Sequence, residues 1–560
     1  MNYTFQYIPF KSWKIASVAA IVVLTSSAAI AQNKGEGTVQ DEEVTIEKNR
    51  KITLPPANRI FDKIPSPKAN TESQKQTYSF VERKLNVGAS KFNPVISPFQ
   101  NDGKIENGYD NYVRLGGGNF GRIFGEAFLT SPTENDGVLN LYAKHNSSSQ
   151  GPVDDKNSAN NEQVIKLNAK YLTNDFKLFG SLGFDREQFY FYGYKQKATP
   201  IERETIQQIL NKYSFNVGIE NAKNDASIDY GLKTGITFLK DHYTASELDW
   251  GTKFNASFVI NQNFLSNLDA VAHVTQREDG ITDNRNWFQV KPSFTYKTST
   301  FNVSLALNAV VESDKRRSLS RTMGFPVINV DFTPLQGVHI FAGMDGTIER
   351  NTLTELLAEN RWLAPQANLK NTELTRQFYV GTKGALGSGF NYEAKISYGQ
   401  YKDFYVFANA KADSSKLVVL YDSLKTSVTS VVGQLNYQQE DFWRSFLKVE
   451  YYNYNMGSLE KAFSRPNLKI SWNNTLVFKQ KLFLTTDVYL LSGIYGKNFA
   501  TNQTVKLNSI VDLNAKMTYQ LTDQLSAFVS MNNILGKNYE RYLYYKQQGL
   551  NFLLGLSFSF

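Results

Sequence analysis

Histidine and cysteine, the side chains that most often carry metal and nucleophilic chemistry, are scarce in this chain of 560 residues. Cysteine is absent, which excludes disulfides and thiolate metal ligands. Zinc hydrolases carry a His-Glu-x-x-His helix and many serine hydrolases a Gly-x-Ser-x-Gly turn, and the sequence contains neither pattern. We therefore predict a protein that is not an enzyme and holds no cofactor or metal; a catalytic site assembled from separate strands and loops is the alternative. The four histidines are His145, His242, His273 and His339.

The last twelve residues, 549–560, alternate between apolar and polar side chains, as a strand between lipid and a watery lumen would. Asn551, Gly555, Ser557 and Ser559 would face the lumen. A chain that ends on phenylalanine in this register carries the kind of signal that barrel-assembly machinery recognises. We therefore predict an outer-membrane β-barrel, with an edge strand of a soluble sheet as the alternative. The lipid face of this closing strand would carry Leu550, Phe552, Leu554, Leu556, Phe558 and Phe560.

The N-terminus has the pattern of a secretory signal peptide. Lys11 and Lys14 precede an apolar run from Ile15 to Leu24, and Ala29-Ile30-Ala31 supplies the small residues that a signal peptidase reads. We expect cleavage after Ala31, so that residues 1–31 are the signal peptide. The run is too short to span a bilayer as a helix.

The composition also favours a barrel over a bundle of membrane-spanning helices. Aromatic residues make up 14% of the chain, yet the mean hydropathy is −0.39, because strand residues alternate between apolar and polar. Beyond the signal peptide no apolar segment reaches about 18 residues. The net charge of +9 is mild for this length and gives no reason to expect nucleic-acid binding. A basic surface that contacts lipopolysaccharide or an acidic lumenal ligand is one interpretation, and an evenly solvated rim is the other.

Short polar turns recur along the chain, and each interval between them has room for two strands and one longer loop. Ten such turns, with both barrel ends facing the periplasm, imply 22 strands. The turns are 133–136, 174–175, 223–225, 262–263, 298–299, 334–337, 386–389, 439–441, 479–481 and 522–524.

The longer loops would lie on the outer side, and helix-like pieces are expected at Ile201 to Leu210 and at Thr352 to Trp362. Aromatic residues at strand ends, Trp443 near an inner turn and Tyr542, Tyr544 and Tyr545 near an outer loop, are expected in the girdles at the membrane interfaces. The longest loops are 146–163, 195–211, 350–374 and 408–425.

The stretch from Met531 to Tyr542, Met-Asn-Asn-Ile-Leu-Gly-Lys-Asn-Tyr-Glu-Arg-Tyr, followed by the terminal strand, resembles the last hairpin of TonB-dependent receptors. The loop Ala364 to Glu373 is similar to one that recurs in their barrels, and 22 strands is also that family's number. The resemblance covers about residues 107–560 and implies an outer-membrane receptor barrel.

The N-terminal region departs from that family, whose members fold a plug of well over a hundred residues, with an Arg-Gly element, inside the barrel. Residues 32–106 are too few for a plug and contain no Arg-Gly pair. Their prolines predict an extended, polyproline-like or unfolded tail. Within the tail, Glu43-Val44-Thr45-Ile46 resembles the short box by which such receptors pair with the periplasmic TonB protein, through strand addition. The prolines are Pro55, Pro56, Pro65, Pro67, Pro94 and Pro98.

Two functions follow from these observations. In the first, the barrel is a transport path across the outer membrane, closed by its loops, its tail or a partner, since an open lumen of this width would compromise the membrane. In the second, it is a non-transporting subunit that anchors a larger outer-membrane complex. The expected partners are outer-membrane lipid and lipopolysaccharide, the barrel-assembly machinery, and TonB or another periplasmic or outer-membrane protein. Inward residues would make the lumen wettable, and His273 and His339 are expected there as hydrated polar groups, in phase with Asp269 and Asp345. The other inward residues are Lys448, Glu450, Asp487 and Lys516.

Overall fold

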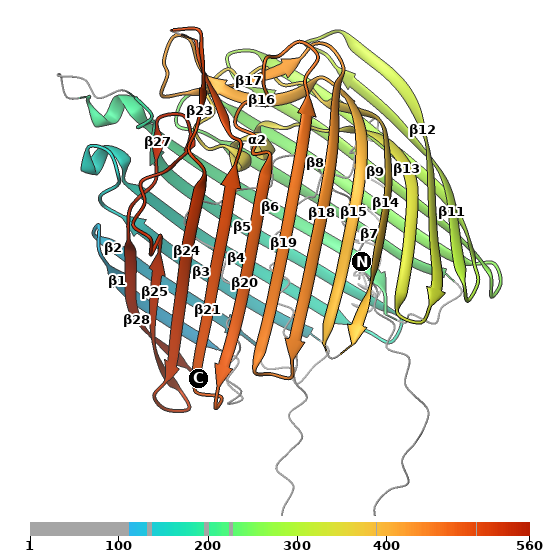
Figure 1. Ribbon diagram of the computed structural model, residues 1–560, viewed down its shortest axis with the longest axis horizontal. Helices are drawn as coiled ribbons and strands as arrows, with labels where there is room; N and C mark the ends of the chain where they lie inside the picture. Colours follow the sequence, from blue (N-terminus) through green and yellow to red (C-terminus); the bar gives the residue numbers. More distant parts are fainter. Residues whose placement is uncertain (1–110, 132–136, 195–200, 223–227, 388, 500) are drawn as a thin grey trace, which may run out of the picture.

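The computed structural model describes residues 111–131, 137–194, 201–222, 228–387, 389–499 and 501–560, and these form a closed antiparallel barrel of 22 strands (Figure 1). Each barrel strand pairs with the next one along the chain, and β1 (Tyr112–Gly118) pairs with both β2 (Arg122–Thr130) and β28 (Asn551–Ser559), which closes the barrel. The predicted fold class and strand number are confirmed.

The strands between β2 and β28 vary from 8 residues in β25 to 17 in β12. In the first half they are β3 (Gly137–Ser148), β4 (Asn160–Leu172), β5 (Phe176–Tyr190), β6 (Gln207–Asn221), β7 (Ile228–Lys240), β8 (Ser246–Val259), β9 (Phe264–Glu278), β10 (Thr282–Lys297), β11 (Phe301–Asp314) and β12 (Leu319–Leu335). In the second half they are β13 (Val338–Glu349), β14 (Thr372–Gly387), β15 (Phe390–Lys402), β18 (Thr426–Gln439), β19 (Trp443–Asn455), β20 (Leu468–Phe478), β21 (Leu482–Ser492), β24 (Ile510–Gln520) and β25 (Leu525–Asn532).

Among the described residues, three two-stranded hairpins and three short helices lie in the connections between barrel strands. The hairpins pair β16 (Phe404–Asn409) with β17 (Leu417–Asp422), β22 (Tyr495–Asn498) with β23 (Gln503–Lys506), and β26 (Glu540–Tyr542) with β27 (Tyr545–Lys546). The helices are the 3₁₀ turns η1 (Asp155–Ser158) and η2 (Arg203–Ile206) and the α-helix α2 (Leu353–Glu359). Among the described residues, no helix has the length and hydropathy needed to cross a membrane.

Side chains alternate between the outer surface and the lumen along each barrel strand, as the sequence predicts. On β28 the outward residues Leu554 and Leu556 are 52% and 53% exposed, while the inward Leu553 and Ser557 are buried. The inward placement of Lys448 and Lys516 follows from the outward placement of their neighbours Tyr451 and Met517. The structure thus places Phe552, Leu554, Leu556, Phe558 and Phe560 together on the lipid-facing surface.

The chain enters and leaves the barrel at the same end, which we call the inner end. The backbone amide of Asn111 donates to the carbonyl of Phe560 at 3.2 Å, and the amide of Phe560 donates back at 3.0 Å. Eight of the ten predicted short turns fall on connections at this end, and the other two, 133–136 and 223–225, lie outside the described residues. The predicted signal peptide 1–31, the predicted tail 32–106 and residues 107–110 also lie outside the described residues.

Three local predictions differ at least in part from the structure. The predicted helical piece from Thr352 to Trp362 is confirmed in part by α2, but Ile201 to Leu210 is a single 3₁₀ turn followed by the start of β6, so the helix prediction there is wrong. The loop predicted from Ala408 begins earlier, at the hairpin β16–β17. Tyr542 and Tyr545 are buried under the outer loops, not placed in a lipid-facing girdle, because their rings pack against other loops.

Candidate functional site: an apolar cap of outer loops

The loops at the outer end pack against one another over the lumen in an arrangement that we call the loop cap. It comprises the described parts of 191–206, 241–245, 350–371, 403–425, 456–467, 493–509 and 533–550. In Figure 1, β16 and β17 lie across the top of the barrel, and α2 lies just below them. Buried apolar residues from five of these loops, on well-separated strands, form one continuous cluster. A shared apolar core fixes loops relative to one another in the way a small domain core does.

The hairpin β16–β17 lies between two apolar clusters. All six residues of β16 are buried. Tyr405 and Phe407 pack into the cluster that contains α2, while Phe404, Val406 and Ala408 pack into a second cluster with Phe463 and Tyr452. Because successive strand residues point to opposite faces, an entirely apolar strand fits only where both faces are covered. The hairpin is therefore the central layer of the cap.

Aromatic rings from three loops meet at Trp362, which follows α2. The ring of Trp362 stacks on that of Tyr545 with a centroid distance of 4.0 Å, and Tyr192 and Tyr542 contact it edge-on at 5.7 and 5.9 Å. The hydroxyl of Tyr545 donates to the carbonyl of Ser415 in the β16–β17 loop. This junction joins loops that follow β5, β13, β15 and β25, so it links distant parts of the barrel wall.

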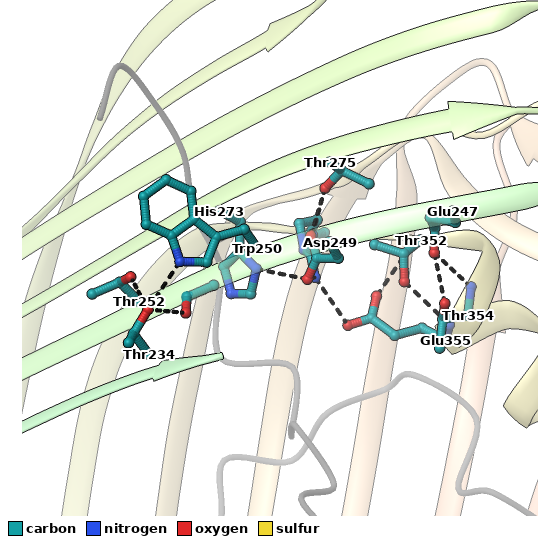
Figure 2. Close-up of polar contacts among 12 residues, drawn as sticks. Thr234, Glu247, Asp249, Trp250, Thr252, His273, Thr275, Thr352, Thr354 and Glu355 are labelled. Carbon is teal, nitrogen blue, oxygen red and sulfur yellow. Dashed lines mark hydrogen bonds and ion pairs between the residues drawn. The ribbon is translucent and has the colours of Figure 1, made fainter. Parts of the chain in front are cut away.

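The helix α2 is held against the lumen wall by a carboxylate from β8. Glu247 accepts hydrogen bonds from the backbone amides of Leu353 and Thr354, at 2.7 and 2.9 Å, and from the Thr354 hydroxyl at 2.7 Å (Figure 2). Thr352 and Glu355 form a capping box at the same helix end. The first amides of a helix have no partner within the helix, and a carboxylate there is also favoured by the helix dipole. Glu247 therefore acts as a cap supplied by a strand five positions away in the barrel.

Next to this helix end, Arg350 forms an ion pair with Asp249, the next inward residue of β8. One guanidinium nitrogen contacts Asp249 Oδ1, and the other lies 2.8 Å from Oδ2. Asp249 also accepts from Thr275 Oγ1 at 2.7 Å and contacts His273 Nδ1 at 2.9 Å (Figure 2). Although burial alone would lower the pKa of Arg350, the carboxylate of Asp249 raises it. The arginine stays charged, and the pair fixes the start of the 350–371 loop.

The rest of this loop is fixed by two more arginines of the wall. Arg277 on β9 donates to the carbonyl of Ala367 at 2.7 Å and is paired with Asp279. Arg285 on β10 donates to the carbonyl of Asn351 at 2.6 Å. Both arginines are buried, and burying a charge is costly unless it is paired and hydrogen-bonded. The loop thus replaces water as the partner of these groups.

Two charged side chains of the cap, Arg465 and Glu359, are held by the hairpin. Arg465 donates from Nε and Nη2 to the carbonyl of Tyr405 at 3.0 and 2.8 Å, and its guanidinium lies 4.8 Å from the ring centre of Phe404. Glu359, at the end of α2, accepts a 2.6 Å hydrogen bond from the Tyr405 hydroxyl. Its other oxygen is buried and has no hydrogen-bond partner among the described residues, and burial raises the pKa of Glu359.

The four histidines make separate contacts in the structure. His273 and His339 face the lumen as predicted; His339 Nδ1 lies 2.7 Å from Asp331 Oδ1. His145 contacts Ser147 at 3.1 Å, and His242 packs beside Tyr243. Within the described part of the chain, no group of three or more metal-ligating side chains could hold a metal ion. The TonB-box-like residues Glu43 to Ile46 lie outside the described residues.

The residues that build the cap were not singled out by the sequence. Glu247, Asp249, Arg277 and Arg285 look like ordinary inward polar positions of strands, and their partners lie about 70 to 110 residues away. One signal was available: the unbroken apolar run from Phe404 to Ala408, directly before the predicted outer loop 408–425, which is typical of a strand buried on both faces.

Comparison with solved structures identifies the fold. No protein-family model matches the chain, and no curated protein does. The iron transporter FrpB of Neisseria meningitidis superposes with a TM-score of 0.64 at 10% identity, over 80% of this chain and 81% of that one. The pyoverdine-bound receptor FpvA of P. aeruginosa gives 0.63 at 11%, over 81% and 72%, and the copper transporter OprC gives 0.59 at 12%, over 81% and 80%. The chain has the fold of a TonB-dependent receptor barrel. At these identities the likeness extends to the fold alone.

Proposed function

We propose that this protein is an outer-membrane transport barrel, similar to a TonB-dependent receptor but without its plug, whose outer mouth is closed by the loop cap. The observation that carries the proposal is the apolar core shared by loops from well-separated strands, with Trp362 and Tyr545 at their junction. A packed core of this kind excludes water. The fold shared with FrpB and OprC, which are named as transporters, supports a transport role.

The lumen below the cap is suited to a hydrated solute. Its wall carries charged side chains of both signs that form ion pairs, such as Lys448 with Glu450 at 3.0 Å and Lys144 with Glu162 at 2.9 Å. Asp487 also points inward, hydrogen-bonded to Asn473. A passage of this kind would conduct ions once its outer mouth opened, which makes conductance a direct measure of closure.

Planar bilayers test closure by the cap. We expect full-length protein to conduct little and Trp362→Ala to conduct strongly, because the substitution removes the ring on which aromatic residues of two other loops pack. Trp472→Ala is the matched control: Trp472 is 44% exposed on the lipid face, and its loss should leave conductance unchanged. A variant lacking residues 41–98 separates the tail from the cap. Strong conductance of that deletion alone would show that the tail closes the pore and would contradict our proposal.

The alternative is a non-transporting barrel that anchors a larger outer-membrane complex. The interlocked loops favour it to the extent that they present a fixed outer surface: Glu247, Arg277, Arg285 and Arg350 join the 350–371 loop to the wall. If Trp362→Ala loosens the cap, as shown by new protease cleavage, without any conductance, the anchor function gains over transport. Gentle purification from membranes would then identify the complex.

Engagement of TonB is the remaining part of the proposal. Glu43 to Ile46 would pair with a sheet edge of TonB through main-chain hydrogen bonds. Replacing Val44 and Ile46 by proline removes two donors and should abolish any energy-dependent uptake, whereas alanine at both positions should preserve it. The proposed location brings contact with lipid and lipopolysaccharide, and the closing strand through Phe560 would be read by the barrel-assembly machinery. We also propose that the protein is not an enzyme, because FrpB and OprC, which share its fold, are named as transporters.

A further inference from the structure

A hollow of about 280 Å³ opens in the lumen wall near the inner end, far from the loop cap. Its polar lining includes Asn302, Ser304 and Asp331, which lie close to the inner turns of β11 and β12. Phe341 on β13 and Tyr379 on β14 form its apolar part, with ring centres 6.3 Å apart. A volume of this size is at the lower limit for a small-molecule site, and it suits one or two side chains of a peptide.

Charge and aromatic character are combined in the hollow. Asp331 is contacted by His339 Nδ1 at 2.7 Å and by Lys383 Nζ at 3.2 Å. The ammonium group of Lys383 lies 5.3 Å from the ring centre of Phe341, and that of Lys395 lies 4.1 Å from the ring centre of Tyr379. Aromatic rings flanked by polar groups are typical of sites that bind proline-containing extended peptides.

The chain itself enters the barrel at the same end. Asn111 is bonded to Phe560 at the inner rim, beside β1. β1 and β11 to β14 lie on opposite sides of a 22-stranded barrel, about 45 Å apart for the usual strand spacing and tilt. A flexible chain of about 50 residues, the number that separates Phe61 from Asn111, spans roughly 40 Å on average, and a match between length and span maximises effective concentration.

One segment of the tail has the composition that the hollow requires. Pro55-Pro56 and Pro65-Ser66-Pro67 flank the apolar residues Ile60, Phe61 and Ile64. Prolines favour extended conformations in a peptide before it binds, which lowers the entropy lost on docking. The apolar side chains match the two rings of the hollow.

We propose that residues 55–67 of the chain dock in this lumenal hollow, with Phe61 against Phe341 and Tyr379. The inner half of the lumen is then occupied by the protein's own tail. This inference goes beyond the proposed transport function and concerns the opposite end of the lumen, so its test requires no conductance or uptake.

Because the chain has no cysteine, introduced pairs can be read without background. In full-length protein in membranes, Phe61→Cys with Ser304→Cys should form an intramolecular disulfide under a mild oxidant, seen as a mobility change that a reductant reverses. The matched control is Phe61→Cys with Leu305→Cys, since Leu305 is the next residue of β11 but points into lipid and is 53% exposed. That pair should remain reduced. Circular dichroism checks that both variants keep the sheet.

A second measurement does not depend on the tail cysteine. Ser304→Cys alone should react with a water-soluble maleimide at least about tenfold more slowly in full-length protein than after deletion of residues 55–67. Equal reactivity in the two proteins would overturn the proposal, because another occupant or none would fill the hollow. A disulfide-linked dimer from the Phe61/Ser304 pair would assign the site to a second copy and would also overturn it.

Discussion

Glu247 is a single carboxylate of β8 on which the position of α2 depends. It is 1% exposed, and it accepts three hydrogen bonds from residues 353 and 354. A carboxylate so deeply buried is tolerated because the helix amides and a hydroxyl replace its water. The same reasoning applies to Asp249 and Arg350. They form an ion pair through two nitrogen–oxygen contacts next to this helix end.

Replacing Glu247 by alanine should therefore loosen the 350–371 loop without unfolding the barrel. The loss of a helix cap costs about 0.5–2 kcal/mol, and the buried amides left behind place this site toward the upper part of that range. Hydrogen exchange at the amides of Leu353 and Thr354 should become at least several-fold faster. Glu220→Ala, at a more exposed inward carboxylate paired with Lys177, is the control and should leave these amides unchanged.

The buried carboxyl group of Glu359 should make the stability of the closed cap depend on pH. Burial raises its pKa above the usual 4.5, although the nearby Arg465 and the Tyr405 hydrogen bond act in the opposite direction. A carboxyl whose pKa is higher in the folded cap than in an open one stabilises the closed cap when protonated. That stability is fully present below about pH 4.5 and is lost as the pH rises through the raised value. Arg541 and Lys469 also face this carboxyl.

Protease cleavage within the cap should accordingly become faster as the pH is raised above 4.5, and Glu359→Gln should remove that dependence. Asp422 supplies the internal contrast. Burial alone would raise its pKa, but hydrogen bonds from Ser458, Thr426 and the Gly457 amide lower it. Its contribution is lost only when the pH falls below the usual 3.8. Cleavage that instead slowed with rising pH would contradict the assignment to Glu359.

At the scale of elements, the closing strand β28 shows how much a regular pattern predicts. Its lipid face was predicted residue by residue, because a period of two leaves one register in which every large apolar side chain points outward. The inward face was less predictable: Ser557 faces the lumen, yet it is 4% exposed and contacts Arg114 Nε at 3.4 Å. The alternation along a strand indicates whether a side chain points outward or inward. It does not indicate how deeply the side chain is buried, because burial depends on the neighbouring strands.

The register has a direct test in substitutions to arginine. Leu554→Arg should reduce the assembled barrel and cost about 2–4 kcal/mol if the residue lies at the bilayer midplane. Ser557 is too confined for a control, so an inward residue of β24, Thr518→Arg, serves instead; it should be mild because it points into the lumen. Heat-modifiable mobility of the barrel in detergent measures assembly. Equal tolerance of the two arginines would refute the register.

The difference between strands and loops explains why the sequence did not predict the cap. Barrel strands pair with their neighbours in sequence, so turns and alternation locate them. The contacts of Trp362 and Tyr545 join loops 183 residues apart, and no local pattern encodes such a pairing. Tyr545 and Tyr542 were expected at the membrane interface because aromatic residues at strand ends are common there. In the structure, the side chains of Tyr542 and Tyr545 instead pack in the apolar core of the outer loops.

At the scale of the whole molecule, the barrel has two unlike ends. One end carries short turns and both points where the chain meets the barrel, and the other carries the packed loops (Figure 1). In the proposed function, the loop cap closes the outer mouth of the lumen, and the polar inner half remains available to the tail or to a periplasmic partner.

The orientation of these ends in the membrane is the last prediction. Short turns face the periplasm in outer-membrane barrels, so epitope tags at Asp154 or Thr501 should bind antibody on intact cells, whereas tags at Asn174 or Asp523 should require permeabilised cells. The structure places the first two beyond β3 and within the β22–β23 loop, and the last two in inner turns. Asp413, also an outer position, is a poorer site because its carboxylate bonds to Ser415 in the cap. Reversed labelling would place the cap in the periplasm, where it could not separate the lumen from the outside, and the proposed transport function would fail with it.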